Sequence, residues 1–307
     1  MAGAAEVLFP GGDDEVATPP ARVSKRAVEA TIPEGALTGR PRVIDGAGRG
    51  SAAPQLRIVT EAELPAPDGF KLDRARARPK VAFFDARREV GLRFRFSGYG
   101  PLDLRVELVR DGKTVHSWEE RDRAPFARHT VRWNGLTDSG NAGPSGRYRF
   151  RIAPANRGGR VAGRFRFYDH RFPVRGAHSY GDRFGAPRSG GRVHEGQDLW
   201  ARCGTRLEAA RGGAVQFKGY SAALYGHYLV IDGRHTERDY MYAHLIHPPP
   251  VKRGARVRTG EGIGAVGRSG NASGEGCQLH FELWPSGWHQ GGPQDPIEEL
   301  RRWDGWS

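Results

Sequence analysis

The stretch that decides the fold is GCQLHFELW, residues 276–284, near the end of the chain. Side chains alternate between the two faces of a β-strand, so Gln278, His280 and Glu282 would share one face. The residues between them form the other face, which is apolar: Cys277, Leu279, Phe281 and Leu283. A strand of this kind lines a site on one side and a core on the other. His280 is therefore the reference point for the other candidate residues.

The chain carries a strong positive charge. Its 48 lysine and arginine residues exceed its 35 aspartate and glutamate residues, which gives a formal net charge of +13. This charge favours polyanionic surroundings, such as nucleic acid, anionic lipid or an anionic wall polymer. The basic residues are spread along the chain rather than gathered in runs, so we expect no nucleic-acid partner. No window approaches the roughly 18 to 20 apolar residues of a membrane-spanning helix, so no membrane span is expected.

Three regions differ in composition. Residues 1–79 are rich in proline, glycine, alanine and charge, which predicts a largely disordered tail or linker. In residues 80–170, short runs alternate apolar and polar side chains and are separated by turns such as Asp111-Gly112, which predicts an antiparallel β-sandwich. Residues 171–307 combine frequent glycine with short strands and form the second part of an all-β protein.

One run within the second region resembles a known domain type. The sequence TVRWNGLTDSGNAGPSGRYRFRI, residues 130–152, is similar to the end of Ig-like domains of the flagellar-hook-cap type. These domains are structural, so the resemblance implies a β-sandwich that spaces or docks and carries no chemistry.

The chain has two cysteines, Cys203 and Cys277. Such a pair is a disulfide, two unrelated buried thiols or part of a metal site. A metal site is disfavoured because Cys277 lies an odd number of positions from His280 and should point to the opposite face. We favour a disulfide, which would close a loop of about 75 residues and stabilise the fold by roughly 4 kcal/mol in the chain-entropy model. A disulfide implies an oxidising compartment.

Two further residues are candidate partners of His280. His194 and Asp198 lie four positions apart in VHEGQD, a spacing that keeps both side chains on one face of an extended segment. Alone, such a pair is more often a surface pair than a site. Together with His280 it forms a His, Asp, His set, which suits zinc with a fourth position open for water.

His244 lies in DYMYAHL, where strict alternation would place it on the same face as Tyr240 and Tyr242. One interpretation is a histidine at a strand end that packs beside the tyrosines. The other is a general base, or a donor to an oxyanion, next to the metal.

Several short motifs occur in a fixed order: FPVRG at 172–176, FG at 184–185, HEGQD at 194–198, YAHL at 242–245, a glycine-rich run at 251–270, LHFE at 279–282 and DP at 295–296. In this order they resemble the lysostaphin or LytM type of zinc metalloendopeptidase, which cleaves peptide bonds in bacterial cell-wall peptidoglycan. The resemblance covers about 40 per cent of the chain. It implies an antiparallel β metallopeptidase domain over residues 171–307.

The resemblance also implies roles for individual residues. His194, Asp198 and His280 would bind Zn²⁺, and His244 would be the catalytic histidine that assists the metal-bound water. The partners would be peptidoglycan peptides and anionic cell-wall polymers. An extracellular or cell-envelope location follows, although the N-terminus MAGAAEVLFP shows no readable secretory signal.

Gln278 departs from the pattern of this family, which has a second catalytic histidine at that position. A glutamine amide can donate a hydrogen bond to an oxyanion, but it cannot shuttle a proton at neutral pH. General acid-base assistance contributes about 10²–10⁴-fold to a rate. The prediction is therefore an endopeptidase with reduced or altered activity. The alternative is a catalytically silent, zinc-bearing module that binds peptidoglycan or activates another hydrolase.

Overall fold

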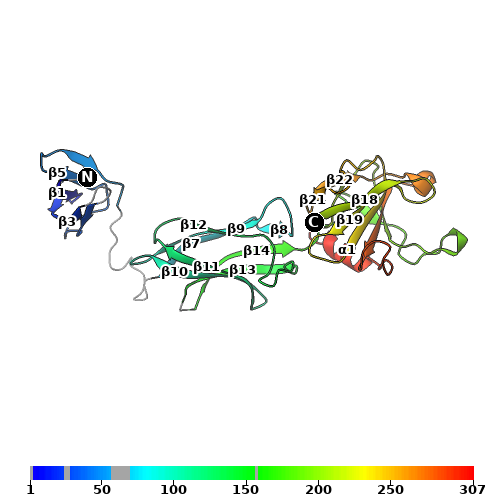
Figure 1. The fold of residues 1–307 in the computed structure, drawn as a ribbon, viewed down its shortest axis with the longest axis horizontal. Coiled ribbons are helices and arrows are strands. Elements are labelled where there is room, and N and C mark those ends of the chain that lie inside the picture. The colour runs from blue at the N-terminus through cyan, green and yellow to red at the C-terminus, as the bar shows by residue number, and fades with distance from the viewer. Residues whose placement is uncertain (1–2, 24–27, 57–69, 156–157) are drawn as a thin grey trace. The chain divides into compact units, whose positions relative to one another are not determined.

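The computed structural model describes residues 3–23, 28–56, 70–155 and 158–307 (Figure 1). Strands make up most of the regular structure, and α1 (Ile297–Asp304) is the only α-helix in these ranges. The expected all-β class is confirmed. Within the described ranges no helix is both long and apolar enough to cross a membrane.

The N-terminal residues form a small β unit. A four-stranded sheet has the order β2-β1-β5-β6, and β3 pairs with β4. The strands are β1 (Ala4–Phe9), β2 (Val16–Thr18), β3 (Pro20–Val23), β4 (Val28–Ala30), β5 (Arg42–Asp45) and β6 (Gly50–Ala52). A small cluster formed by Val7, Phe9 and Ala36 is buried beneath them.

The expectation of disorder over residues 1–79 is therefore wrong for the described part of that segment; residues 1–2, 24–27 and 57–69 lie outside the described ranges. The strands are three to six residues long and bury few side chains, so composition gave no sign of them. The expected boundary at residue 79 also differs from the structure, because β7 (Lys71–Arg78) belongs to a sheet of the next region.

The middle region contains two sheets, with strand orders β11-β10-β13-β14-β8 and β12-β9-β7. Their strands are β8 (Val81–Phe83), β9 (Val90–Ser97), β10 (Leu102–Arg110), β11 (Lys113–Arg123), β12 (His129–Trp133), β13 (Gly146–Pro154) and β14 (Arg160–Tyr168). Trp133 on one sheet lies 5.1 Å from Tyr148 and 4.5 Å from Phe167 on the other, measured between ring centroids. The sheets thus pack face to face, and the Ig-like resemblance stays a prediction.

The C-terminal region is built on a seven-stranded sheet of order β15-β16-β23-β20-β19-β18-β21, beside a two-stranded sheet, β17-β22. The strands are β15 (His178–Tyr180), β16 (Gln197–Ala201), β17 (Arg206–Glu208), β18 (Gly213–Ser221), β19 (Gly226–Gly233), β20 (Asp239–Leu245), β21 (Arg256–Val257), β22 (Gly262–Ala265) and β23 (Gln278–Trp284). The 3₁₀ turns are η2 (Ser189–Gly191) and η3 (Gly270–Gly274).

The two faces of β23 differ as the alternation of the sequence predicts. Leu279, Phe281 and Leu283 are fully buried in the main core of this region, which also contains Leu300 and Trp303 of α1. Gln278, His280 and Glu282 lie on the other face, where they line a cavity. The sheet thus carries a core on one side and a polar site on the other.

A disulfide joins Cys203 and Cys277, whose Cα atoms lie 5.2 Å apart, which confirms the predicted pairing. It ties the start of β23 to a segment 74 positions earlier in the chain. We expect reduction, or the double change Cys203→Ser and Cys277→Ser, to lower the free energy of unfolding by about 4 kcal/mol. Urea unfolding with and without a thiol reductant measures this, and equal midpoints would contradict it.

His170 is a buried histidine that makes the stability of this region depend on pH. Its Nε2 lies 2.7 Å from the Tyr240 hydroxyl, and its ring stacks on Trp303 with centroids 4.4 Å apart. Burial lowers the pKa of His170 below its ordinary value, although Asp169 opposes the shift. The unfolded chain therefore binds a proton near pH 6.5 that the folded chain does not bind.

It follows that His170 favours folding above about pH 6.5 and that this contribution is lost as the pH falls below that value. We expect the melting temperature to drop between about pH 7 and pH 5, and His170→Gln to flatten this slope. The exposed His247→Gln is the matched control. Parallel curves for the wild type and His170→Gln would refute the assignment.

Candidate metal centre

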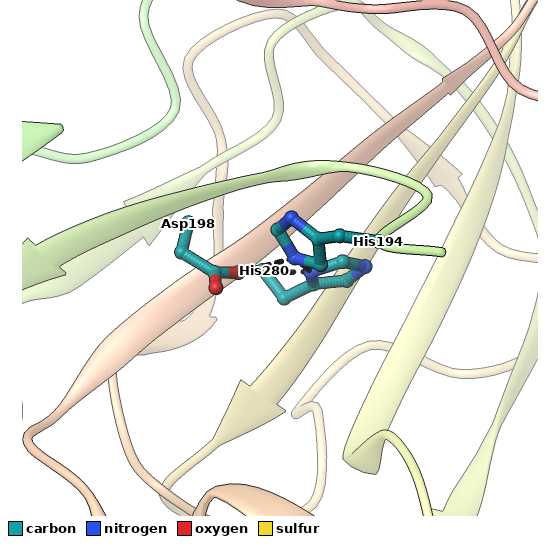
Figure 2. A group of neighbouring side chains, drawn as sticks. All are labelled: His194, Asp198 and His280. Carbon is teal, nitrogen blue, oxygen red and sulfur yellow. Dashed lines mark hydrogen bonds and ion pairs between the residues drawn. The ribbon is translucent and has the colours of Figure 1, made fainter. Parts of the chain in front are cut away.

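Three side chains converge on the polar face of β23, as Figure 2 shows. Asp198 on β16 pairs directly with His280 on β23, and residues opposite each other on neighbouring strands have Cβ atoms about 5 Å apart. Asp198 Oδ1 lies 2.9 Å from His280 Nδ1 and 3.1 Å from His194 Nε2, and these two nitrogens are 2.8 Å apart. All three residues are at least 94% buried. The structure thus brings together the three residues that the sequence named as ligands.

His194 reaches this cluster from the loop before β16. Its backbone N–H donates to the Ala186 carbonyl, and its own carbonyl accepts from the Gly185 N–H, each at 2.8 Å. Its Nδ1 lies 2.9 Å from the Arg183 carbonyl oxygen, which can only accept, so Nδ1 carries the proton in the neutral ring. Its Nε2 then presents a lone pair to the cluster.

Glu282 fixes the tautomer of His280, so that this ring also presents a lone pair to the cluster. Its Nε2 donates to Glu282 Oε1 at 2.9 Å, which leaves the lone pair of Nδ1 facing His194 and Asp198. Two nitrogen lone pairs and a carboxylate oxygen therefore meet with no protein hydrogen between them, a donor set that requires a cation. Nitrogen and carboxylate ligands of this kind suit zinc.

The pKa shifts show how strongly the cluster attracts positive charge. Burial would raise the pKa of Asp198, but its contacts with the rings of His194 and His280 outweigh burial and hold this pKa well below the usual range. Burial would lower the pKa of His280, but hydrogen bonds with Asp198 and Glu282 raise it to about 9. Without a metal the cluster therefore holds a proton, and protons and metal ions compete for such ligands.

His244 reaches the site through an irregularity in β20. The register between β19 and β20 shifts between His227 and Leu229, and His244 has a φ of +61°. A bulge of this kind re-aims a side chain at the end of a strand. His244 accordingly lines the same cavity as His280, and their ring centroids are 5.8 Å apart.

The expectation that His244 shares a face with Tyr240 and Tyr242 is wrong, because the bulge interrupts the alternation. Both tyrosines point into the main core. The Tyr242 hydroxyl accepts from the Ala210 N–H at 2.8 Å, and the Tyr240 hydroxyl contacts His170.

A hydrogen bond to a backbone carbonyl fixes the tautomer of His244. Its Nδ1 donates to the Ser269 carbonyl at 2.9 Å, so Nε2 is the free ring nitrogen. Burial, together with the nearby charge of His280, lowers the pKa of His244 to about 4. His244 is therefore neutral at pH 7.

Gln278 opens β23 at the edge of the cavity and is 3% exposed. Its amide nitrogen donates to Glu275 Oε2 at 2.9 Å, and this orients the amide because a carboxylate only accepts. Its Oε1 is buried and has no hydrogen-bond partner among the described residues. Gln278 therefore offers the cavity an acceptor that the protein itself does not use.

The cavity, of about 530 Å³, has further lining residues that the sequence analysis did not single out. Arg188 Nη2 lies 3.7 Å from Asp198 Oδ2 and 3.1 Å from Asp182, so the outer oxygen of Asp198 faces a cation. Tyr225 lines the wall, and burial raises its pKa, with Glu282 and Glu195 adding to the shift, so it remains a neutral phenol. Of these additional lining residues, only Glu282 could be placed at the site from the sequence, because it shares a strand face with His280.

Comparison with known proteins gives one curated relative that matches part of the chain. The "L-Ala--D-Glu endopeptidase" of Bacillus subtilis (strain 168) is 31% identical over 147 residues, which cover 44% of this chain and 44% of that protein. The chain thus spans less than half the length of this relative.

Two solved structures are also similar to part of the chain. The catalytic domain of lysostaphin from Staphylococcus simulans is 25% identical, with 40% of this chain and 92% of that chain covered and a TM-score of 0.37. A variant of the catalytic domain of the prophage-encoded M23 protein EnpA from Enterococcus faecalis is 28% identical. The match covers 41% of this chain and 95% of that chain, with a TM-score of 0.35. Residues 192–296, which include all five candidate site residues named from the sequence, match the family model described as Peptidase family M23.

Proposed function

We propose that the C-terminal region is a zinc-dependent endopeptidase that hydrolyses peptide bonds in bacterial cell-wall peptidoglycan. The observation that carries this proposal is the convergence of His194, Asp198 and His280 at a cavity inside the region that matches Peptidase family M23. The relative whose name specifies a bond between L-alanine and D-glutamate supports the substrate class, because bonds between L- and D-amino acids are typical of peptidoglycan.

The atoms that would hold zinc are His194 Nε2, Asp198 Oδ1 and His280 Nδ1. Catalytic zinc sites have three protein ligands and structural sites have four, so this set of three would fit the catalytic type. When bound, zinc supplies an acidified water and polarises the scissile carbonyl. The protein residues then have to orient the peptide and move protons.

His244 is the residue suited to proton movement. It is neutral at pH 7, and its free Nε2 can accept a proton from water and return it to the leaving amine. Because burial lowers its pKa to about 4, its protonated form is a strong donor to that amine. The hydrogen bond to Ser269 holds the ring in this tautomer throughout.

Gln278 would orient the substrate. Its unused Oε1 can accept a hydrogen bond from a substrate N–H, while Glu275 keeps the amide from turning over. Since an amide does not exchange protons at neutral pH, His244 remains the one group of this pair that can transfer them. The proposed enzyme therefore has a complete metal-binding set and a reduced acid-base set.

A second function fits the same residues. A zinc-bearing module that binds wall peptides, or activates another hydrolase, would keep the ligands and dispense with proton transfer. The glutamine at position 278 favours this alternative.

We place the protein outside the cell or in the cell envelope, in keeping with its disulfide and its proposed substrate. The net charge of +13 would help to retain it on anionic cell-wall polymers.

The metal is tested first. We expect purified protein to contain one zinc ion per chain, and chelation to abolish the release of amino groups from peptidoglycan until zinc is restored. Asp198→Ala should lose both zinc and activity, because it removes the only charged ligand. Asp232→Asn, which changes an exposed carboxylate outside the cavity, is the control. Wild-type protein without zinc, or an active Asp198→Ala, would exclude the proposal.

Restoring the missing acid-base group is the second test. We expect Gln278→His to raise kcat on peptidoglycan by about 10²-fold with no change in zinc content, because general acid-base assistance is worth about 10²–10⁴-fold. Gln278→Leu, which removes the amide, should raise KM. Mass analysis of the released fragments identifies the bond that is cleaved.

Comparison of the wild type with Gln278→His also separates the two functions. Stoichiometric zinc with no cleavage by either the wild type or Gln278→His would favour the silent module. Cleavage by the wild type that Gln278→His fails to increase would show that the glutamine serves the reaction in its own right.

A further inference from the structure

Glu282 is a fully buried carboxylate whose two oxygens are both occupied. Its Oε1 accepts from His280 Nε2 at 2.9 Å, and its Oε2 accepts from the indole N–H of Trp284 at 2.7 Å. Glu282 is 0% exposed and Trp284 is 4% exposed. We propose that Glu282, held by Trp284, is a positioning residue that sets the affinity of the metal centre, an inference that rests on the proposed function.

The strand itself builds this arrangement. His280, Glu282 and Trp284 are alternate residues of β23, so their side chains lie in a row on one face. The residues between them, Phe281 and Leu283, are fully buried in the core on the other face and anchor the strand. The packing of the core therefore determines where the Glu282 carboxylate stands relative to His280.

Two hydrogen bonds fix the imidazole. A carboxylate that accepts from Nε2 selects the tautomer of His280 with a lone pair on Nδ1, the atom that faces His194 and Asp198. The indole N–H of Trp284 keeps the carboxylate from rotating away from the ring. Carboxylates placed behind ligating histidines in this way raise the basicity of the ligand and hold its orientation.

The charges point to the same role. A buried carboxylate is costly unless a cation compensates it, and within the described ranges no lysine or arginine forms an ion pair with Glu282. Asp198 and Glu282 together supply two negative charges around His280, which matches a divalent cation. Glu282 is not suited to act as a general base, because neither of its oxygens is free.

The test measures zinc binding directly, by competition with a chromophoric chelator. Removing an outer-shell partner costs 10–100-fold in metal affinity. We expect about 100-fold weaker binding for Glu282→Leu. Glu282→Gln should lose only about 10-fold, because its amide oxygen can still accept from His280. The exposed Glu261→Gln is the matched control and should bind zinc as the wild type does.

Trp284→Phe gives a second approach that leaves Glu282 in place. The phenyl ring keeps most of the packing but removes the indole donor, and we expect about threefold to tenfold weaker zinc binding. A change in the visible spectrum of the cobalt-substituted Glu282→Gln and Trp284→Phe proteins would show that the ligand field, and not only the stability, has changed.

The outcomes separate this inference from the proposed function. If the wild type binds zinc and all three variants bind it equally, with wild-type cobalt spectra, Glu282 has no positioning role and the proposed function stands. If the wild type itself binds no zinc, both fail. If Glu282→Leu does not fold, Glu282→Gln and Trp284→Phe still decide the question.

Discussion

The candidate site depends on the register of β23 between its two neighbours. His280 lies opposite Asp198 on β16 and opposite Ala243 on β20, the residue before His244. A slip of one residue would turn His280 into the core and bring an apolar side chain to the site. The fully buried Leu279, Phe281 and Leu283 oppose such a slip, since each would have to leave the core. The geometry of the polar face is thus maintained by the packing of the apolar one.

The parts of the site that follow from strand periodicity could be predicted from the sequence. Alternation placed Gln278, His280 and Glu282 together and Cys277 opposite them, and the structure agrees. Alternation says which face a side chain occupies but not which atom it reaches. The contact of Glu282 with the ring of His280, and that of Gln278 with Glu275, depend on side-chain rotation and on the loop that ends at the strand.

Predictions failed where the backbone leaves regular geometry. The bulge in β20 turns His244 away from Tyr240 and Tyr242, and nothing in DYMYAHL signals a residue with positive φ. In the N-terminal unit the strands are too short to show a period, and proline, glycine and charge dominate the composition. Its small cluster around Val7 and Phe9 gains order from pairing between distant segments, such as β1 with β5.

The strand β23 would also allow the proposed metal binding and proton transfer to vary independently. From His280 to Trp284 each polar group on the site face has a partner. The His280 imidazole contacts Asp198 and Glu282, and the Glu282 carboxylate accepts from the His280 imidazole and the Trp284 indole. Toward the other end, the Gln278 side chain donates one hydrogen bond to the exposed Glu275, and its carbonyl oxygen has no partner in the part of the chain that the structure describes. A substitution at position 278 would therefore alter the chemistry offered to a substrate without disturbing the proposed metal ligands. A substitution at 282 would do the reverse, because it would act on the metal through His280 and leave the substrate contacts in place.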